Sequence, residues 1–348
     1  MDASDYKAQA TRLAKHLAEK HGVALKHASL LEAVAAMHGA RDWNILVAKR
    51  NPLWQRVLPR KKPFINLVPS LDELQFEIPS EGLRIGLDMA QTEEIALGYP
   101  WLRRHLLVLG APGVGAHSTV AFLAAQHVLR GGGVLWLCAT PEMSDQNLSL
   151  LCEATAQVGR AAPQDISATP LQGLPSGKAL EEGVFYAATE RAAGAQAPSA
   201  TGLGLLDHLL AQAKSWAGSQ KNPPFMVVVQ GAGTFGDPRW AEALAQARAL
   251  GAMFVIQAQD LAELQWAGER FAHSIVANTG TKLLFQPTTP AELRAQTDLL
   301  RLTGHAAENP TLEQEFSSLG LGSAMLACCG RLQHVRTCMV DLRPGRPA

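Results

Sequence analysis

The stretch HLLVLGAPGVGAHSTVAFLAAQ, from His105 to Gln126, decides the expected fold. An apolar run typical of a buried parallel strand leads into a glycine-rich turn, and a run with helical spacing follows. Gly110 and Gly115 have the spacing of the phosphate-binding motif G-x-x-x-x-G-K-[S/T], with Gly113 between them. Glycines allow tight turns in which backbone N–H groups converge, and the helix N-terminus adds positive potential. The stretch therefore predicts a P-loop (Walker A loop) between a strand and a helix.

The side chains of this loop do not complete the motif. Ala116 stands where a lysine should bridge the β and γ phosphates, and His117 stands where a hydroxyl should hold Mg²⁺. With the motif shifted by one residue, Ser118 and Thr119 offer hydroxyls, but neither register contains a lysine. Histidine is mostly neutral near pH 7 and cannot replace a permanent ammonium. We therefore expect at most weak binding of ATP or ADP, and no other cofactor.

Strands and helices alternate through the rest of this region, which predicts an α/β fold with a mainly parallel sheet covered on both faces. The apolar runs predict strands at 84–90, 105–110, 134–139, 225–230, 253–259 and 281–286, with two antiparallel edge strands in 323–342 around Gly330. Helical spacing predicts helices at 118–133, 145–160, 205–217, 239–251, 260–268 and 290–304. Residues 161–204 are rich in Ala, Pro, Gly, Ser and Gln and predict a loop-rich insertion with one helix near 178–193.

Two domains joined by a basic linker are expected along the chain. Residues 1–48 form a small all-helical module, because apolar residues recur at helical spacing in 6–22, 27–39 and 40–50. Residues 49–63 form a basic linker with three prolines and no acidic residue, and residues 64–348 form the α/β domain. The linker is either a solvated connector or an arm that contacts phosphates or a partner. Its basic residues are Lys49, Arg50, Arg56, Arg60, Lys61 and Lys62.

Composition limits the classes of function. The chain has 348 residues, 47% of them hydrophobic, and a formal net charge of zero, so no overall field attracts nucleic acid. The five cysteines form no Cys-x-x-Cys pair, which favours reduced thiols. Neither a signal peptide nor an apolar run of about 18 residues is found. We expect a cytoplasmic protein without a transmembrane segment and without a bound metal, since the N-terminal histidines lack ligand spacing.

The order of elements from residue 82 onward resembles the motor domain of type IV secretion coupling proteins, the TraD/TraG family of conjugation, related to the FtsK/HerA class. The stretches that carry this resemblance are GLRIGLDMAQTEEIAL, HLLVLGAPGVG, PPFMVVVQGAGTFGD, ALAQARALGAMFVIQAQDLAEL and IVANTGTKLLFQ. The resemblance implies a RecA-like P-loop NTPase fold.

In that family the third core strand ends in Asp-Glu (Walker B), where aspartate orients the Mg²⁺ shell and glutamate polarises the attacking water. Gln230 and Gly231 occupy these two positions here. Gln259 matches a glutamine that senses the nucleotide, and Arg248 matches an arginine that in family members is often near a neighbour's nucleotide. A strand-end hydrogen bond for Gln259 and a solvated helix charge for Arg248 are the alternative roles.

The N-terminal segment resembles a glyoxalase-superfamily-related helical module of plasmid and mobile-element proteins, through the signature HGARDWN at residues 38–44. The family label says little about function. We expect its aromatic and apolar residues to form a small helical core that docks on a partner.

Together these features favour a pseudo-ATPase, a catalytically degenerate coupling-protein-like subunit of a conjugative or type IV secretion DNA-transfer system. It would be an assembly or adaptor component, whose partners are other secretion components or a related active ATPase, single-stranded DNA, and further copies in a homo- or hetero-oligomer. Two alternatives stay open: an active ATPase or DNA motor with an atypical site, and a non-enzymatic anion-binding interaction protein. Enzyme status is thus open, and the sequence favours the absence of catalysis.

Overall fold

The computed structural model describes most of the α/β region and a few positions before it. The described ranges are 82–89, 94–139, 141–167, 175–188, 223–235, 239–249, 251–304, 309–328 and 330–337, with single helical residues at 11, 12, 20, 30, 34, 204, 207, 208 and 211. The chain divides into two compact units, Met1–Pro63 and Phe64–Ala348. In the first unit the described residues are helical, and Leu30 and Val34 are buried. The predicted helix at 40–50 and the basic segment 49–63 lie outside the described residues.

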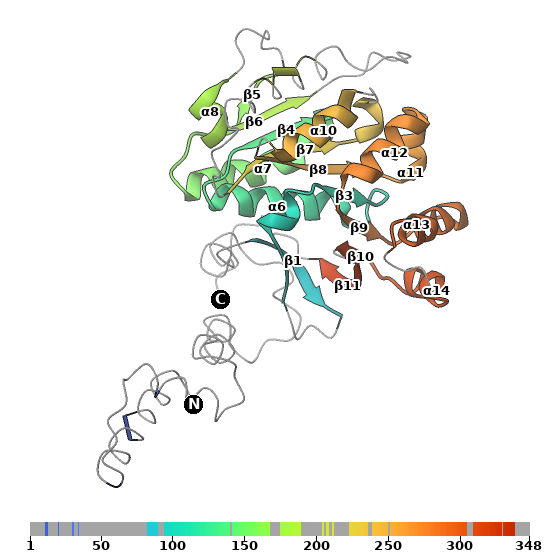
Figure 1. Cartoon of the computed structure of the whole chain (residues 1–348). Helices are drawn as coiled ribbons and strands as arrows, with labels where there is room; N and C mark the ends of the chain where they lie inside the picture. Colours follow the sequence, from blue (N-terminus) through green and yellow to red (C-terminus); the bar gives the residue numbers. More distant parts are fainter. Residues whose placement is uncertain are drawn as a thin grey trace, which may run out of the picture. The chain divides into compact units, whose positions relative to one another are not determined.

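The described residues of the second unit form an eleven-stranded sheet with the order β2-β1-β11-β10-β9-β3-β8-β7-β4-β6-β5 (Figure 1). In that order the strands are β2 (Glu94–Gly98), β1 (Gly82–Asp88), β11 (Arg331–Thr337), β10 (Ser323–Cys328), β9 (Thr281–Phe285), β3 (Leu106–Leu109), β8 (Ala252–Ala258), β7 (Phe225–Gln230), β4 (Val134–Cys138), β6 (Val184–Ala188) and β5 (Gln164–Asp165). From β9 to β5 all neighbours are parallel, whereas β10, β11, β1 and β2 continue the sheet in antiparallel pairs. The predicted mainly parallel sheet is confirmed.

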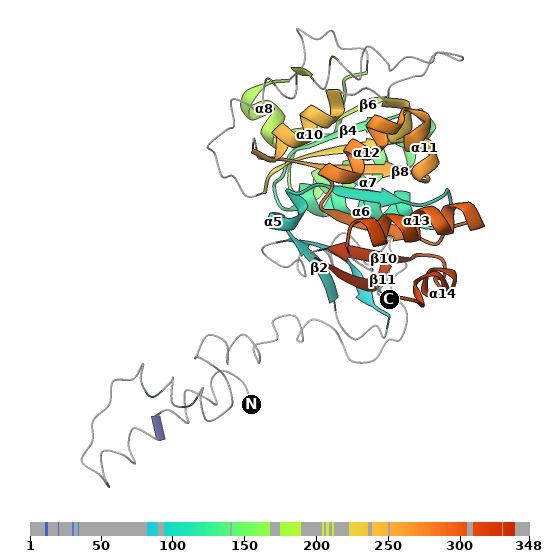
Figure 2. The same ribbon diagram turned by 45° about the vertical axis from the view of Figure 1, so that its right-hand side comes forward.

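Helices cover both faces of the sheet (Figure 1, Figure 2). One face packs against α5 (Tyr99–Leu102), α6 (Ala116–Leu129) and α7 (Pro141–Gln157). The other packs against α8 (Gly177–Glu182), the 3-10 turn η2 (Ala232–Phe235), α10 (Arg239–Ala249), α11 (Leu261–Trp266), α12 (Glu269–Asn278), α13 (Pro290–Leu302) and α14 (Leu312–Ser317). Because β3, β7 and β8 are apolar and buried on both faces, each contributes to two hydrophobic cores.

Two expectations about the strands are wrong. The C-terminal hairpin exists, with Cys328 opposite Arg331, but it is not at the edge of the sheet, because β1 pairs with β11 and β2 pairs with β1. The segment predicted as one helix near 178–193 contains the short helix α8 and then the parallel strand β6, which pairs with β4. Gly183 ends α8, and aromatic residues that favour strands follow it.

The β1–β2 hairpin is attached to α6 by a buried glutamine. Gln126 is fully buried, its Oε1 accepts from Arg84 N at 2.9 Å, and its Nε2 donates to Arg84 O at 2.9 Å. The Arg84 guanidinium in turn pairs with Glu94 of β2, with Nε 2.9 Å from Oε1. These contacts dock the hairpin on the same helix whose N-terminus follows the glycine loop.

Candidate functional site

The glycine loop has the backbone of a phosphate-binding loop. It connects the end of β3 to the start of α6, and Gly110 N donates to Ala258 O of the neighbouring β8 at 3.2 Å. Gly113 has φ 88° and Gly115 has φ 110°, which are left-handed conformations that favour glycine. Gly115 is also the N-cap of α6. The spacing of glycines in the sequence therefore predicted the position and course of this turn.

The N-terminus of α6 keeps its free hydrogen-bond donors. No side chain caps the helix, and within the described chain the N–H groups of Ala116, His117 and Ser118 have no acceptor. Such groups give a helix N-terminus its affinity for anions. The electrostatic frame of a phosphate site is thus present in the backbone.

The side chains of the loop supply no permanent cation and no carboxylate. Ala116 is a buried methyl group, and burial lowers the pKa of the half-buried His117, so this imidazole is neutral at pH 7. Thr119 is buried, and its hydroxyl donates to Gly115 O at 2.9 Å. The hydroxyl that Thr119 offers in the shifted register is thus hydrogen-bonded to the first turn of the helix backbone. Ser118 is exposed.

A buried lysine elsewhere in the unit does not replace the missing one. Lys282 lies at the beginning of β9, so it is at the edge of the sheet opposite the glycine loop. Its Nζ donates to Thr279 O at 2.8 Å, and burial lowers its pKa to about 8. Its ammonium is held at the amino ends of the strands.

The carboxyl end of β7 carries an amide in place of the Walker B aspartate. Gln230 is fully buried, and its Oε1 accepts from Trp136 Nε1 at 3.1 Å and from Asn147 Nδ2 at 3.5 Å. Trp136 lies on β4 and Asn147 on α7, so this contact joins the sheet to its covering helix. The position that holds the Mg²⁺ shell in the resembled family is occupied here by a structural hydrogen-bond network.

The next residue cannot carry the missing glutamate without strain. Gly231 has φ 70°, and a Cβ added to it would lie 2.7 Å from the Cβ of Ala139. A side chain at this position would need both a left-handed backbone and displacement of a buried neighbour. The backbone as well as the sequence therefore disfavours a glutamate at position 231.

The carboxyl end of β8 brings two glutamines to the site. Gln259, the predicted sensor, is exposed just after β8, and its N–H donates to Glu263 Oε2 at 2.6 Å. Gln257, which sequence reasoning missed, is buried, and its Oε1 accepts from Gly231 N at 3.4 Å. Its signal was a polar residue inside an otherwise apolar strand, the same signal that Gln230 gives.

Two further contacts hold the loops around the site. Glu263 of α11 accepts from Gly233 N and Gln259 N, and so ties together the loops that follow β7 and β8. Gly322, just before β10, donates its N–H to Val114 O at 2.9 Å. Thr337 of β11 donates to Gly322 O from both its N–H and its hydroxyl. The C-terminal hairpin thus contacts the glycine loop directly, which local sequence could not reveal.

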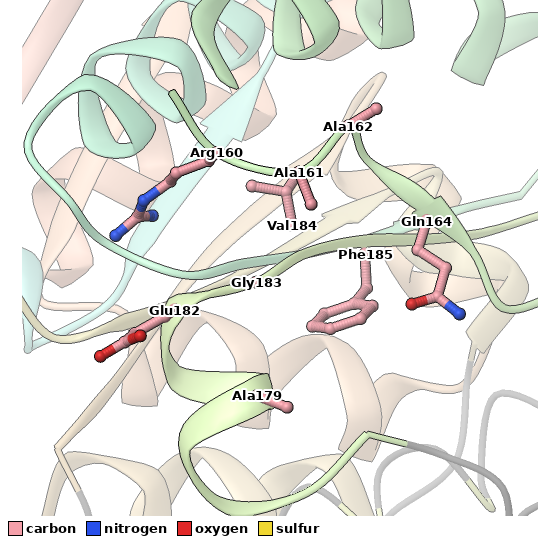
Figure 3. A pocket seen from close by; sticks show the side chains of 9 residues that line it. All are labelled: Arg160, Ala161, Ala162, Gln164, Ala179, Glu182, Gly183, Val184 and Phe185. Carbon is pink, nitrogen blue, oxygen red and sulfur yellow. The ribbon is translucent and has the colours of Figure 1, made fainter. Parts of the chain in front are cut away.

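Other predicted site residues are not brought to this edge. Arg248 lies in the last turn of α10, which runs from the carboxyl end of β7 back to the start of β8, so it is at the opposite edge of the sheet. Lys49, Arg50, Arg56, Arg60, Lys61 and Lys62 lie outside the described residues. A hollow of about 470 Å³ lies beside the amino ends of β5 and β6 (Figure 3). Its wall includes Arg160, whose guanidinium is bound to the carbonyls of Gly131 and Gly132.

The residues present do not fit a magnesium-bound nucleotide. Within the described ranges no three His, Cys, Asp or Glu side chains are grouped as metal ligands. The oxygen of Gln230 is already bound by Trp136 and Asn147. No step of phosphoryl transfer can be assigned to these side chains.

Solved structures give the fold a wider context. VirB4 of Thermoanaerobacter pseudethanolicus matches at a TM-score of 0.50 and 10% identity, over 76% of this chain and 98% of that chain. The fold is that of RecA-like P-loop ATPases. The match confirms the predicted fold. At 10% identity, such a match is evidence for the fold and not for the function.

Two other solved structures are similar to this chain. The conjugative coupling protein TrwB matches at a TM-score of 0.49 and 12% identity, over 82% of this chain and 97% of that chain. EccC of Thermomonospora curvata (ATPases 2 and 3) matches at 0.48 and 14% identity, over 80% of this chain and 44% of that chain.

The sequence comparisons concern mainly the N-terminal unit. Residues 1–61 match the model of a family described as glyoxalase superfamily protein, in agreement with the resemblance seen in HGARDWN. No curated protein matches the chain significantly. None of the helices in the described ranges has the length and apolar character needed to cross a bilayer.

Proposed function

We propose that this chain is a catalytically degenerate, coupling-protein-like subunit of a conjugative or type IV secretion DNA-transfer system, acting in the cytoplasm as an assembly or adaptor component. The observation that carries the proposal is the contrast at one site between an intact loop backbone and absent catalytic groups. Gly113 and Gly115 keep their left-handed conformations, whereas Ala116, Gln230 and Gly231 replace the lysine and the acidic pair.

The physical reason is that assembly and catalysis need different parts of this fold. Phosphoryl transfer depends on positioned charges that neutralise the phosphates. Contacts between subunits depend on the shape and charge of surfaces, which the sheet and its helices maintain without nucleotide. The likeness of the fold to VirB4 supports a place among secretion components.

We expect the purified protein to show no ATP hydrolysis above background in the presence of Mg²⁺, as measured by phosphate release. In a thermal-shift panel, ATP with Mg²⁺ should stabilise the protein no more than ATP with EDTA, because binding to the native state raises the apparent stability only where a site exists. Brisk Mg²⁺-dependent turnover that Gln259→Ala reduces would instead establish the active-ATPase alternative. Gln314→Ala, at an exposed position on α14, is the matched control.

The basic segment is the proposed contact with single-stranded DNA or a DNA-processing partner, because six cations lie in fifteen residues without an acid. We expect a variant with these six residues changed to Gln to lose retardation of a single-stranded oligonucleotide in a gel-shift assay, and the loss should be mimicked by high salt. Unchanged binding by the variant would remove DNA contact from the role of this segment.

A further inference from the structure

The amino edge of the parallel sheet, where β9, β3, β8, β7, β4, β6 and β5 begin, carries a row of cations. In sheet order, from β11 to β5, these are Arg331, Lys282, Arg103, Arg104, Arg248, Arg130 and Arg160, each at or shortly before the start of a strand. Among the described residues that lead into these strands, the only acidic ones are Glu181 and Glu182, at the end of α8. The chain as a whole has zero net charge, so this edge is a local concentration of positive charge.

Helix dipoles explain only part of this row. Arg130 and Arg160 follow the C-termini of α6 and α7, where the partial negative charge of a helix end favours a cation. Arg331 instead begins a strand after a turn, and it is exposed. Arg104 follows a helix of one turn and is also exposed. These two guanidinium groups are therefore the ones that a ligand from solvent can reach.

An exposed tryptophan lies beside Arg104. Trp101 of α5 is 38% exposed, and the Arg104 guanidinium lies over its ring, 5.1 Å from the centroid. Gly280 N donates to Arg104 O, which ties this segment to the start of β9. Only β9 and β10 separate β3 from β11, which begins at Arg331. With strands about 4.8 Å apart, the backbones of the two arginines are roughly 14 Å apart.

The shape of the row favours a flexible polyanion. Neighbouring strands are rotated by about 20°, so the nine strands from β11 to β5 turn this edge through roughly 160°. A flat membrane surface cannot follow such an edge, and duplex DNA, with a persistence length of about 50 nm, bends little over this distance. A single-stranded nucleic acid can follow it, and its unpaired bases stack on aromatic rings and on guanidinium planes.

We propose that the amino edge of the sheet binds a single-stranded nucleic acid, with a base stacked on Trp101 and phosphates on Arg104 and Arg331. The other cations of the row extend the positive potential along the nucleic acid. This surface, which includes α5, lies on the side of the unit opposite α11 and α13 (Figure 2). The inference rests on the proposed function, since it adds a second contact for the single-stranded DNA that is assigned there to the basic segment 49–63.

The test is fluorine NMR of the full chain labelled with 5-fluorotryptophan, during a titration with a single-stranded oligothymidylate. The chain has seven tryptophans, and single Trp→Phe variants assign their signals. We expect the Trp101 signal to shift and to saturate. Trp54 lies in the basic segment, so its signal reports the contact that belongs to the proposed function. Trp266, 65% exposed on α11 at the carboxyl edge, is the matched control and should not shift.

Two pairs of variants measure the contributions by fluorescence anisotropy of the labelled oligonucleotide. Trp101→Ala should raise the half-saturating protein concentration about tenfold, because the stacking of one base is lost, whereas Trp266→Ala should leave it unchanged. Arg331→Gln should reduce the steepness of log affinity against log salt by about 0.7, the contribution of one phosphate contact on a single strand. Arg294→Gln, at an exposed position on α13, should not change this slope. If Trp101→Ala does not fold, the Trp101 signal of the wild type and the slope of Arg331→Gln decide.

The outcomes separate this inference from the proposed function. A shift of the Trp54 signal alone would overturn the inference and leave the DNA contact of the basic segment intact. A shift of the Trp101 signal alone would support the inference and remove that contact from the basic segment. No shift of either signal would overturn both contacts.

Two further results would also overturn the inference. One is a Trp101 signal that shifts with phosphatidylglycerol vesicles and not with the oligonucleotide, which would make the edge a membrane-binding surface. The other is a shift of the Trp266 signal equal to that of Trp101, which would show binding without a preferred site. The absence of catalysis is tested separately by ATP turnover.

Discussion

Replacement of His105 by alanine is expected to lower the free energy of unfolding by about 3 kcal/mol, because one buried ring joins three elements. His105 precedes β3 and is 1% exposed. Its Nε2 lies 2.8 Å from Leu244 O of α10, and its Nδ1 accepts from Phe254 N of β8 at 3.1 Å. The ring also packs edge-on against Phe254, with centroids 5.4 Å apart. Alanine would remove both hydrogen bonds and leave a cavity.

Replacement of His105 by glycine should destabilise the protein less than replacement by alanine. This is the reverse of the usual order of stability for these two substitutions. His105 has φ 64°, a left-handed conformation that costs a residue with a Cβ roughly 1 kcal/mol and costs glycine little. We expect His105→Gly to unfold at a higher denaturant concentration than His105→Ala. The control is His273, an exposed histidine inside α12, where alanine should be more stable than glycine by about 1 kcal/mol. The same order at both positions would show that the backbone at residue 105 carries no strain.

Acid is expected to destabilise the α/β unit through His127. This residue of α6 is fully buried, with Nδ1 3.1 Å from the Tyr99 hydroxyl, and burial lowers its pKa from 6.5 to about 3. The positive charges of Arg130 and Arg160 lower this pKa further. Between these two pH values the unfolded chain binds a proton that the folded chain does not, so stability falls as the pH falls below about 6.5.

For one such group, the free energy of unfolding changes by at most about 1.4 kcal/mol per pH unit. Urea unfolding at pH 7.5 and pH 5 measures it, and the informative quantity is the difference between variants, because other groups titrate as well. His127→Gln should reduce the loss of stability between the two pH values, whereas His273→Gln, at the exposed position, should not change it. His117 has a pKa lowered by burial and contributes in the same direction. An equal loss in both variants would assign the acid sensitivity to other groups.

The local elements of this fold follow from short-range patterns. The runs at 105–110, 225–230 and 281–286 form strands because nearly all of their residues are apolar, as expected for strands that are buried on both faces. The glycines of 110–115 set the turn into α6. The missed elements include β2 with five residues, α5 with four and α14 with six, whose patterns are weak by themselves, and also the ten-residue helix α12. The hairpin β10–β11 was predicted around Gly330, but its place inside the sheet depends on pairing with β1.

What the sequence by itself determined at the site is its missing chemistry: no lysine at 116, no hydroxyl at 117 and no acid at 230 or 231. Only the tertiary structure decided how those positions are used. Gln230 accepts hydrogen bonds from Trp136 and Asn147, which lie 94 and 83 positions away in the sequence. Gly231 has a left-handed backbone conformation and lies next to Ala139. Gly322, near the other end of the chain, donates a hydrogen bond to the glycine loop. A residue type limits which charges and hydrogen bonds are available. Which partner an amide meets depends on strands that are distant in sequence and adjacent in the sheet.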